Sequence, residues 1–231
     1  MITGESLSNR RFNETEKSER LEMVGEMAAS IAHEIRNPLT SVKGFVKLIE
    51  QGFNSEDYFN HIHSSLTDIE EYLKELLLIA QPQPIESKEV NIRQLVENVI
   101  GKIKQTMGFY EIELKVEYEA DSENVICDPL QMEMVIKHLL TNSIEAVSGG
   151  GKITIIVCRE DTNLLIKVTD NGIGMSQERL AKLGEPYFDL KEKGTGIGLM
   201  ICYRIIWQYN GSINVESEEN KGTIVEVRLP L

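Results

Sequence analysis

The stretch Asp170-Asn171-Gly172-Ile173-Gly174-Met175 follows an alternating run over 163–170 that is typical of a β-strand. An aspartate at the end of a strand can accept a hydrogen bond from an adenine amino group. Glycines directly after it let a flat base approach the backbone closely. The stretch therefore suggests a nucleotide pocket at a strand end, and the segments on either side of it decide the fold.

Three further motifs lie in the same part of the chain. Asn142 falls on a predicted helix within 138–146, and its carboxamide suits Mg²⁺, which prefers oxygen ligands. The glycine-rich segment 194–199 opens another predicted helix, where backbone N–H groups and the helix dipole favour phosphate. Lys221-Gly222-Thr223 begins the last strand. Each motif is weak alone, but their order on these elements indicates a nucleotide-binding domain.

Hydrophobic periodicity sets the elements that carry these motifs. Helices are predicted over about 91–107, 128–147 and 197–209, and strands over about 112–118, 125–127, 152–159, 163–170, 211–217 and 223–229. Helices mixed with largely antiparallel strands predict a two-layer α/β sandwich. Trp207 is expected to pack in the core of this domain.

The first third of the chain has a different pattern. Apolar residues recur alternately three and four apart over 21–49 and again over 59–80, as in coiled-coil helices. Between them, Gly52-Phe53-Asn54-Ser55 supplies a C-terminal glycine and candidate N-caps. Because a lone antiparallel hairpin encloses no core, we expect two copies to pair into a four-helix bundle, which makes the protein a homodimer.

The predicted fold class is therefore α followed by α/β, in two domains. The helical hairpin occupies 1–80, where 1–14 are either disordered or the start of the first helix. A linker over 81–88 begins with Gln81-Pro82-Gln83-Pro84, which breaks the second helix. The α/β domain occupies 89–231.

Composition and charge exclude several classes of partner. The 231 residues carry a formal net charge of −13, which argues against a nucleic-acid partner. No apolar run approaches the roughly 20 residues that span a bilayer, and the N-terminus is polar and charged. We expect a cytoplasmic protein without membrane contact in this chain, although upstream segments could tether a longer form. The three cysteines lie far apart, which predicts neither a metal site nor a disulfide.

Taken in order, these segments resemble the motifs of sensor histidine kinases. His33-Glu34-Ile35-Arg36-Asn37-Pro38-Leu39-Thr40 is similar to their phosphoacceptor box, 138–146 to the N box, 170–174 and 194–198 to the two glycine boxes, and Glu185-Pro186-Tyr187-Phe188 to the F motif of the ATP lid. The resemblance covers roughly residues 15–231, almost the whole chain. The hairpin looks most like the sporulation kinases of spore-forming bacilli.

The resemblance implies a dimerisation and histidine phosphotransfer domain followed by a Bergerat-fold ATP-binding domain. It implies a protein histidine kinase that uses ATP and Mg²⁺ to phosphorylate itself on a histidine. The phosphoryl group then passes to an aspartate of a response regulator, in two-component or phosphorelay signalling that initiates sporulation. If the sporulation resemblance holds, a small inhibitory protein that binds the hairpin is a further expected partner.

The same resemblance assigns the site residues one by one. The catalytic residues are His33, Glu34 and Asn37; the metal ligand is Asn142; and the nucleotide-binding residues are Asn142, Asp170, Gly172, Gly174, Gly194, Thr195, Gly196, Gly198, Leu199 and Thr223. His33 would be the nucleophile and Glu34 would fix its tautomer. Asn37 occupies the position that in relatives supports dephosphorylation of the regulator.

Two segments depart from the family pattern, the N box and the lid. His138 stands four residues before Asn142, where the family usually has an asparagine. A contact with phosphate, a contact with water and simple packing all remain open for His138. In the lid, Asp189 and Leu190 follow the phenylalanine where relatives often carry threonines, so the lid contacts are undetermined.

Two other functions compete with the kinase. ATPases of the gyrase, heat-shock chaperone and mismatch-repair type share the fold and activate water with a carboxylate on the N-box helix. The chain has His138 there instead, which counts against hydrolysis as the main activity. A non-catalytic scaffold that acts by dimerisation is the second alternative, and the presence of the motif glycines, Asn142 and Asp170 disfavours it.

Overall fold

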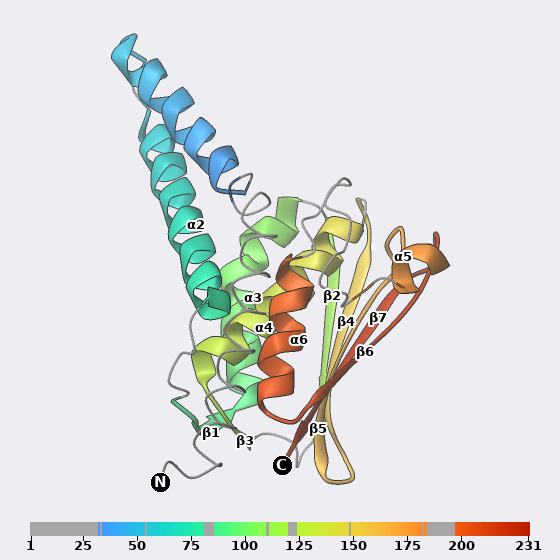
Figure 1. Cartoon of the computed structure of the whole chain (residues 1–231). Coiled ribbons are helices and arrows are strands. Elements are labelled where there is room, and N and C mark those ends of the chain that lie inside the picture. The colour runs from blue at the N-terminus through green and yellow to red at the C-terminus, as the bar shows by residue number, and fades with distance from the viewer. Residues whose placement is uncertain are drawn as a thin grey trace, which may run out of the picture. The chain divides into compact units, whose positions relative to one another are not determined.

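The computed structural model describes residues 32, 34–53, 55–80, 86–109, 111–119, 124–147, 149–181, 183 and 197–231. Two compact units are present, of which the first comprises Met1–Gln83 with Leu190–Ile197 and the second Pro84–Asp189 with Gly198–Leu231. They are drawn together in Figure 1, and each is described by itself below. His33, Gly194, Thr195 and Gly196 lie outside the described residues, as do Asp189 and Leu190 of the lid.

The first unit is a pair of helices joined by a tight turn. The first helix runs over 34–50 and stops at Gly52, which has a φ of 88° and donates its N–H to the Ile49 carbonyl at 3.0 Å. A left-handed glycine in this place is a common helix C-terminus. Helix α2 (Glu56–Ala80) then begins behind Ser55, whose hydroxyl accepts a backbone N–H of its first turn at 3.3 Å. Gly52 and Ser55 therefore have the helix-ending and helix-capping roles that the sequence predicted for this turn.

The two helices pack against each other through aromatic rings near the turn. The Phe45 ring lies 5.4 Å from the Tyr58 ring, centroid to centroid. Further along α2, Phe59, Leu66 and Leu73 recur every seventh residue and remain 47%, 44% and 44% exposed. The helical hairpin is thus present as predicted, and it carries an apolar stripe that the described residues leave about half exposed.

The second unit contains the remaining elements. Its helices are α3 (Ile92–Phe109), α4 (Pro129–Ala146), α5 (Gln177–Ala181) and α6 (Ile197–Gln208). Its strands are β1 (Lys88–Asn91), β2 (Glu113–Tyr118), β3 (Asn124–Cys127), β4 (Lys152–Glu160), β5 (Asn163–Asp170), β6 (Ser212–Glu218) and β7 (Gly222–Pro230). Strands β1 and β3 form an antiparallel pair, and the main sheet has the order β2-β4-β5-β7-β6, with only β2 and β4 parallel.

The core of this unit lies between the main sheet and helices α3, α4 and α6, which cover one face of the sheet (Figure 1). Side chains along β4 alternate, so that Ile153, Ile155 and Val157 are buried while their neighbours face outward. The helices contribute Ile136, Leu139, Leu140, Ile201 and Ile205, all at most 2% exposed. The two-layer α/β sandwich predicted from the pattern is confirmed.

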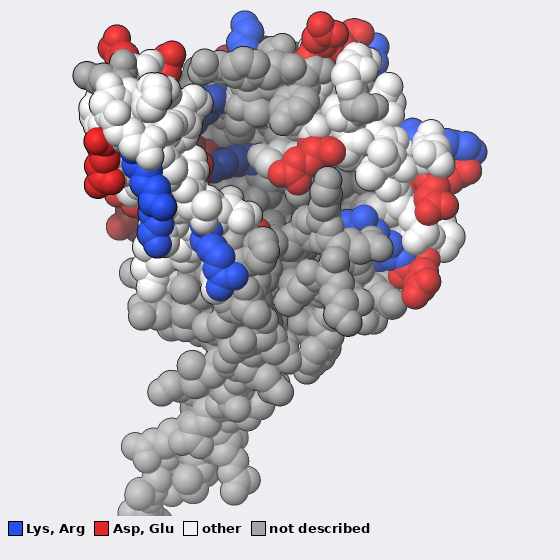
Figure 2. All heavy atoms as spheres, turned by 90° about the horizontal axis from the view of Figure 1, so that it is seen from above, with Lys and Arg blue, Asp and Glu red and all other residues white. Residues whose placement is uncertain are grey.

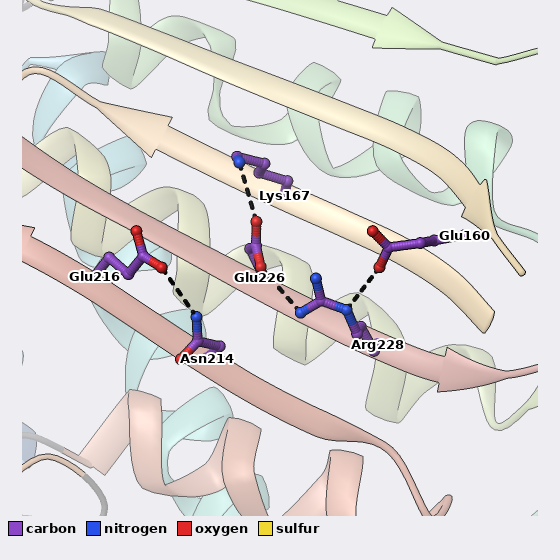
Figure 3. Close-up of polar contacts among 6 residues, drawn as sticks. All are labelled: Glu160, Lys167, Asn214, Glu216, Glu226 and Arg228. Carbon is purple, nitrogen blue, oxygen red and sulfur yellow. Dashed lines mark hydrogen bonds and ion pairs between the residues drawn. The ribbon is translucent and has the colours of Figure 1, made fainter.

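The opposite face of the sheet is polar. On this face, Arg228 contacts Glu160 at 2.8 Å and Glu226 at 2.9 Å, and Lys167 contacts Glu226 at 3.0 Å (Figure 3). The hydrogen bond from Lys167 and that from Arg228 hold the pKa of Glu226 below its usual value. These partly exposed pairs add little stability each, but they keep this face of the sheet polar.

Three features differ from the sequence-based expectation. Strand β1 and the short helix α5 were not predicted, and β1 begins at Lys88, the last residue of the expected linker. The prediction that Trp207 packs in the core is wrong, because its side chain is 82% exposed. Helix α6 buries Ile201, Cys202, Ile205 and Ile206 on one face, and the next position turns about 100° away from the sheet.

The described surface gives two negative findings. On the face shown in Figure 2, acidic and basic side chains are interspersed over the described atoms, and neither sign forms a continuous field. Among the described helices, none is both long and apolar enough to cross a membrane.

Candidate functional site

Asp170 lies at the last position of β5, directly opposite Thr223 of β7. Its Oδ1 accepts the backbone N–H of Gly172 at 2.9 Å and that of Thr223 at 3.2 Å. Its Oδ2 accepts the hydroxyl of Ser143 on α4 at 3.3 Å. The carboxylate therefore joins two strands, the loop after β5 and a helix, and its orientation is set from three directions.

This carboxylate is buried, with the residue only 6% exposed. Burial raises the pKa of Asp170, and the hydrogen bonds from Gly172, Thr223 and Ser143 act in the opposite direction. A buried carboxylate with one oxygen already holding two donors has its remaining acceptor capacity on the other oxygen. The arrangement suits a ligand that presents a single N–H donor.

The glycines beside Asp170 are required by the protein's own backbone. A Cβ on Gly172 would lie 2.5 Å from the Ala146 carbonyl oxygen, and one on Gly174, which has a φ of 61°, would lie 2.0 Å from that of Glu218. The sequence interpretation assigned these glycines to the close approach of a base. The structure adds a backbone-to-backbone approach that locks the loop between α4 and the β6–β7 turn, and the approach of a base stays a prediction.

Hydrogen bonds fix the same loop on both sides. The N–H of Ile173 donates to the Ala146 carbonyl at 2.9 Å, and the Ile173 carbonyl accepts the N–H of Asn220 at 2.7 Å. Beneath it, the hydroxyls of Ser217 and Thr223 lie 2.9 Å apart. The protein's own hydrogen bonds thus hold the loop in place, and a loop held in this way has a lower entropic cost of binding a ligand.

Helix α4 presents a polar face beside this loop. It is capped by Asp128, whose Oδ1 accepts the N–H of Leu130 at 2.9 Å. His138, Asn142 and Glu145 follow at spacings of four and three and therefore share one side of the helix. Asn142 and Glu145 are exposed, so an amide oxygen and a carboxylate lie together on that side.

His138 packs against the start of α6. A Cβ placed on Gly198 would lie 2.7 Å from Nδ1 and 3.1 Å from Cγ of the His138 ring. The packing role that the sequence left open for His138 therefore has a contact in the structure, and the contacts with phosphate and with water stay predictions. The imidazole supports the helix turn that follows the second glycine-rich segment.

This contact predicts the effect of a methyl group. Gly198→Ala is expected to lower the free energy of unfolding by about 1–3 kcal/mol, because the ring must leave its place or the helix must shift. Chemical denaturation measures the change. Adding His138→Ala removes the clash, so the double variant should lose less stability than the sum of the two single variants. Additive losses would contradict the contact.

The structure brings part of the predicted set together. Asp170, Gly172, Gly174 and Thr223 meet at one end of the sheet, with Asn142 on α4 and both Gly198 and Leu199 on α6. Glu34 and Asn37 lie on the helix over 34–50 of the first unit.

Sequence reasoning did not select Ser143, Ser217 or Glu145. Ser143 offered a signal, because the apolar period of α4 puts this polar residue on the buried face, where it is 4% exposed. A buried hydroxyl needs a partner. The other two have no pattern that singles them out.

Two family models match the chain. Residues 127–231 match the histidine kinase-, DNA gyrase B-, and HSP90-like ATPase family, and residues 23–85 match the His Kinase A (phospho-acceptor) domain. These are the segments in which the sequence analysis placed the nucleotide motifs and the His33 box.

Similar proteins are known from several bacteria. Sporulation kinase E of Bacillus subtilis is 39% identical over 93% of this chain and 30% of its own length. Sporulation kinase A of the same organism is 38% identical over 93% of this chain and 36% of its own length. The chain thus spans about a third of these relatives.

Solved structures agree with the fold. The histidine kinase ThkA, crystallised in complex with the response regulator protein TrrA, aligns with a TM-score of 0.70 and 28% identity over 96% of this chain and 66% of its own. Its nucleotide-free catalytic domain aligns with a TM-score of 0.58 and 29% identity over 63% of this chain and 95% of its own.

Proposed function

We propose that this chain, which belongs to the histidine kinases by the two family models that it matches, is the catalytic core of an autophosphorylating kinase. A ring nitrogen of His33 attacks the γ-phosphorus of ATP, the bond from that phosphorus to the bridging oxygen breaks, and ADP leaves. The phosphoryl group then moves to an aspartate of a response regulator. The observation that carries the proposal is the buried Asp170 carboxylate, preset by three hydrogen bonds at a strand end.

The nucleotide is expected to bind with its adenine at Asp170. The free acceptor position on Oδ2 suits the 6-amino group of adenine, because that group donates one N–H along the edge of the base. The β- and γ-phosphates then lie toward α6, whose start carries Gly198 and Leu199, while Gly194, Thr195 and Gly196 contribute backbone N–H groups. Thr223 supports the base side through its hydroxyl.

The donors on α4 fit Mg²⁺. Asn142 and Glu145 are oxygen donors on one exposed face, and the described residues contain no cluster of three or more His, Cys, Asp or Glu that would form a cage. Mg²⁺ in phosphoryl transfer takes few protein ligands and completes its shell with phosphates and water. When bound, the ion neutralises charge on the phosphate oxygens. Asn142 is the residue expected to hold it.

Glu34 and Asn37 serve the phosphoacceptor. Glu34 follows His33 directly, and a carboxylate there orients the imidazole and stabilises the charge that develops on it. Asn37 is one helical turn further on and exposed, where it can orient water for removal of the phosphoryl group from the regulator. Phosphatase activity is therefore part of the proposal.

The partners follow from the hairpin and the relatives. The half-exposed stripe of Phe59, Leu66 and Leu73 at seven-residue spacing supports a homodimer through a four-helix bundle. ThkA was solved with a response regulator, which supports a regulator as the partner of this chain. The names of the sporulation kinases among its relatives support a role in starting sporulation. A location in the cytoplasm and a small inhibitory protein on the hairpin are further parts of the proposal, which rest on the resemblance in sequence.

Incubation with γ-labelled ATP and Mg²⁺ tests the proposal. The chain should acquire label that is stable to base and labile to acid, and His33→Gln should acquire none while it binds ADP as the wild type does. Transfer of the label to a receiver domain from a related bacterium would support the second step. Nucleotide binding without any label on the wild type would contradict the kinase and favour the scaffold.

ATP hydrolysis is the second candidate, and Glu145 favours it. This carboxylate shares a helix face with Asn142, so a general base is present near the metal donors although His138 occupies the usual position. Release of phosphate by the His33→Gln variant, lost on adding Glu145→Gln, would establish hydrolysis as an independent activity.

A further inference from the structure

The two oxygens of Asp170 have different surroundings. Oδ1 accepts two backbone N–H groups, at 2.9 and 3.2 Å, and so uses both of its lone pairs. Oδ2 accepts a single described donor, the Ser143 hydroxyl at 3.3 Å. One acceptor position therefore remains on Oδ2, and the direction of that position depends on where the hydroxyl sits.

Ser143 is placed to hold that hydroxyl still. It lies on the buried side of α4 and is 4% exposed. A serine inside a helix commonly bonds the carbonyl one turn earlier, whereas this one donates across to the sheet. Its own carbonyl accepts the N–H of Val147 at 3.1 Å, which closes the end of the helix. The side-chain hydroxyl and the backbone carbonyl of Ser143 are thus both held by hydrogen bonds.

We propose that Ser143 is a positioning residue for base recognition: it occupies one lone pair of Asp170 Oδ2 and leaves the other aimed at the 6-amino group of adenine. The inference rests on the proposed binding of adenine at Asp170. Ser143 does not touch the base and acts only through the carboxylate. Without the hydroxyl, Oδ2 has two open acceptor positions, and the geometry that favours adenine over other bases is less preorganised.

A purely structural role for Ser143 predicts something different. If the hydroxyl only stabilises the domain, its removal changes the affinity for every nucleotide by the same factor. If it positions Asp170, its removal weakens only ligands that carry the 6-amino group. The ratio of two affinities separates the roles, because general damage to the domain cancels in the ratio.

The experiment titrates the full chain with ADP and with purine riboside diphosphate, which lacks the 6-amino group, by calorimetry. The wild type should prefer ADP by about tenfold or more, as expected for a hydrogen bond to a charged group. Ser143→Ala should lower this preference about three- to tenfold, the range of one hydrogen bond, with little change for the analogue. Thr154→Ala, which removes a hydroxyl from the outer face of β4, should keep the wild-type preference.

Each outcome decides a separate point. Equal affinity of the wild type for the two ligands would contradict the role of Asp170 in binding adenine, and therefore also the role of Ser143. A wild-type preference that Ser143→Ala leaves unchanged or increases would overturn the role of Ser143 alone. Ser143→Thr keeps the hydroxyl and should retain the preference even if its extra methyl lowers the melting temperature. Loss of the preference in that variant at unchanged stability would also count against the proposal.

Discussion

Asp170→Asn is expected to weaken ADP binding by at least about 100-fold while the domain stays folded. The amide oxygen of asparagine can still accept the N–H groups of Gly172 and Thr223, because it takes the place of Oδ1. The amide nitrogen then replaces Oδ2 and presents donors to the donor on adenine. Two donors facing each other in a buried site cost more than a missing hydrogen bond, and calorimetric titration with ADP measures the loss.

The outer face of the sheet offers a matched control for this variant. Glu226→Gln also converts a carboxylate to an amide, and it neutralises the ion pair with Lys167 at 3.0 Å on the face away from the helices. ADP binding by this control should equal that of the wild type. Retained affinity in Asp170→Asn would place the adenine elsewhere in the domain.

Although Asp170→Asn should bind ADP more weakly, we expect it to be more stable than the wild type. Burial raises the pKa of Asp170 above 3.8, its ordinary value, so the folded state binds the proton more tightly than the unfolded state. The ionised group therefore costs stability at pH values above the folded-state pKa, and this cost disappears as the pH falls through that pKa. Asp170→Asn should raise the free energy of unfolding at neutral pH, and the gain should shrink as the pH falls through the folded-state pKa of Asp170. Urea unfolding above and below that pKa measures it; a constant difference would contradict the burial of an ionised carboxylate.

Gly222→Ala is expected to lower the free energy of unfolding by about 3 kcal/mol or more. Gly222 has a φ of 110°, which disfavours any side chain, and a Cβ there would lie 2.0 Å from the Asp170 carbonyl oxygen. Because the obstacle is backbone, relief requires β5 and β7 to separate at the point where Asp170 meets Thr223. Loss of ADP binding should accompany the loss of stability.

Gly101→Ala is the control for this substitution. Gly101 lies within α3, and a Cβ there would meet nothing within 4 Å. Alanine favours helix over glycine by up to about 1 kcal/mol, so this variant should be as stable as the wild type or slightly more so. If Gly222→Ala and Gly101→Ala lowered the free energy of unfolding by similar amounts, the clash at Gly222 would not be the cause of the loss.

The sequence by itself determined the longer helices and strands and their order. Apolar spacing of three and four predicted the hairpin, and the alternation along β4, β5 and β7 predicted the main sheet, since both periods follow from local backbone geometry. Signals of one or two residues placed Gly52 and Asp128 at helix ends, where the structure has them. The motif that follows β5 at Asp170 and the motif that begins β7 at Gly222 were recognisable because aspartate and glycine are rare in the middle of strands.

Only the tertiary structure decided what the motif residues touch. The four-residue strand β1 and the five-residue α5 are too short for a period to be visible. Trp207 is exposed because the packing of α6 on the sheet sets which face is buried, and apolar character alone does not. Ser143 reaches Asp170, and His138 reaches Gly198, across separations of 27 and 60 residues that no local pattern encodes. The glycines after Asp170 were recognised from the sequence, but the neighbours that require them are carbonyl oxygens brought in from α4 and from the β6–β7 turn.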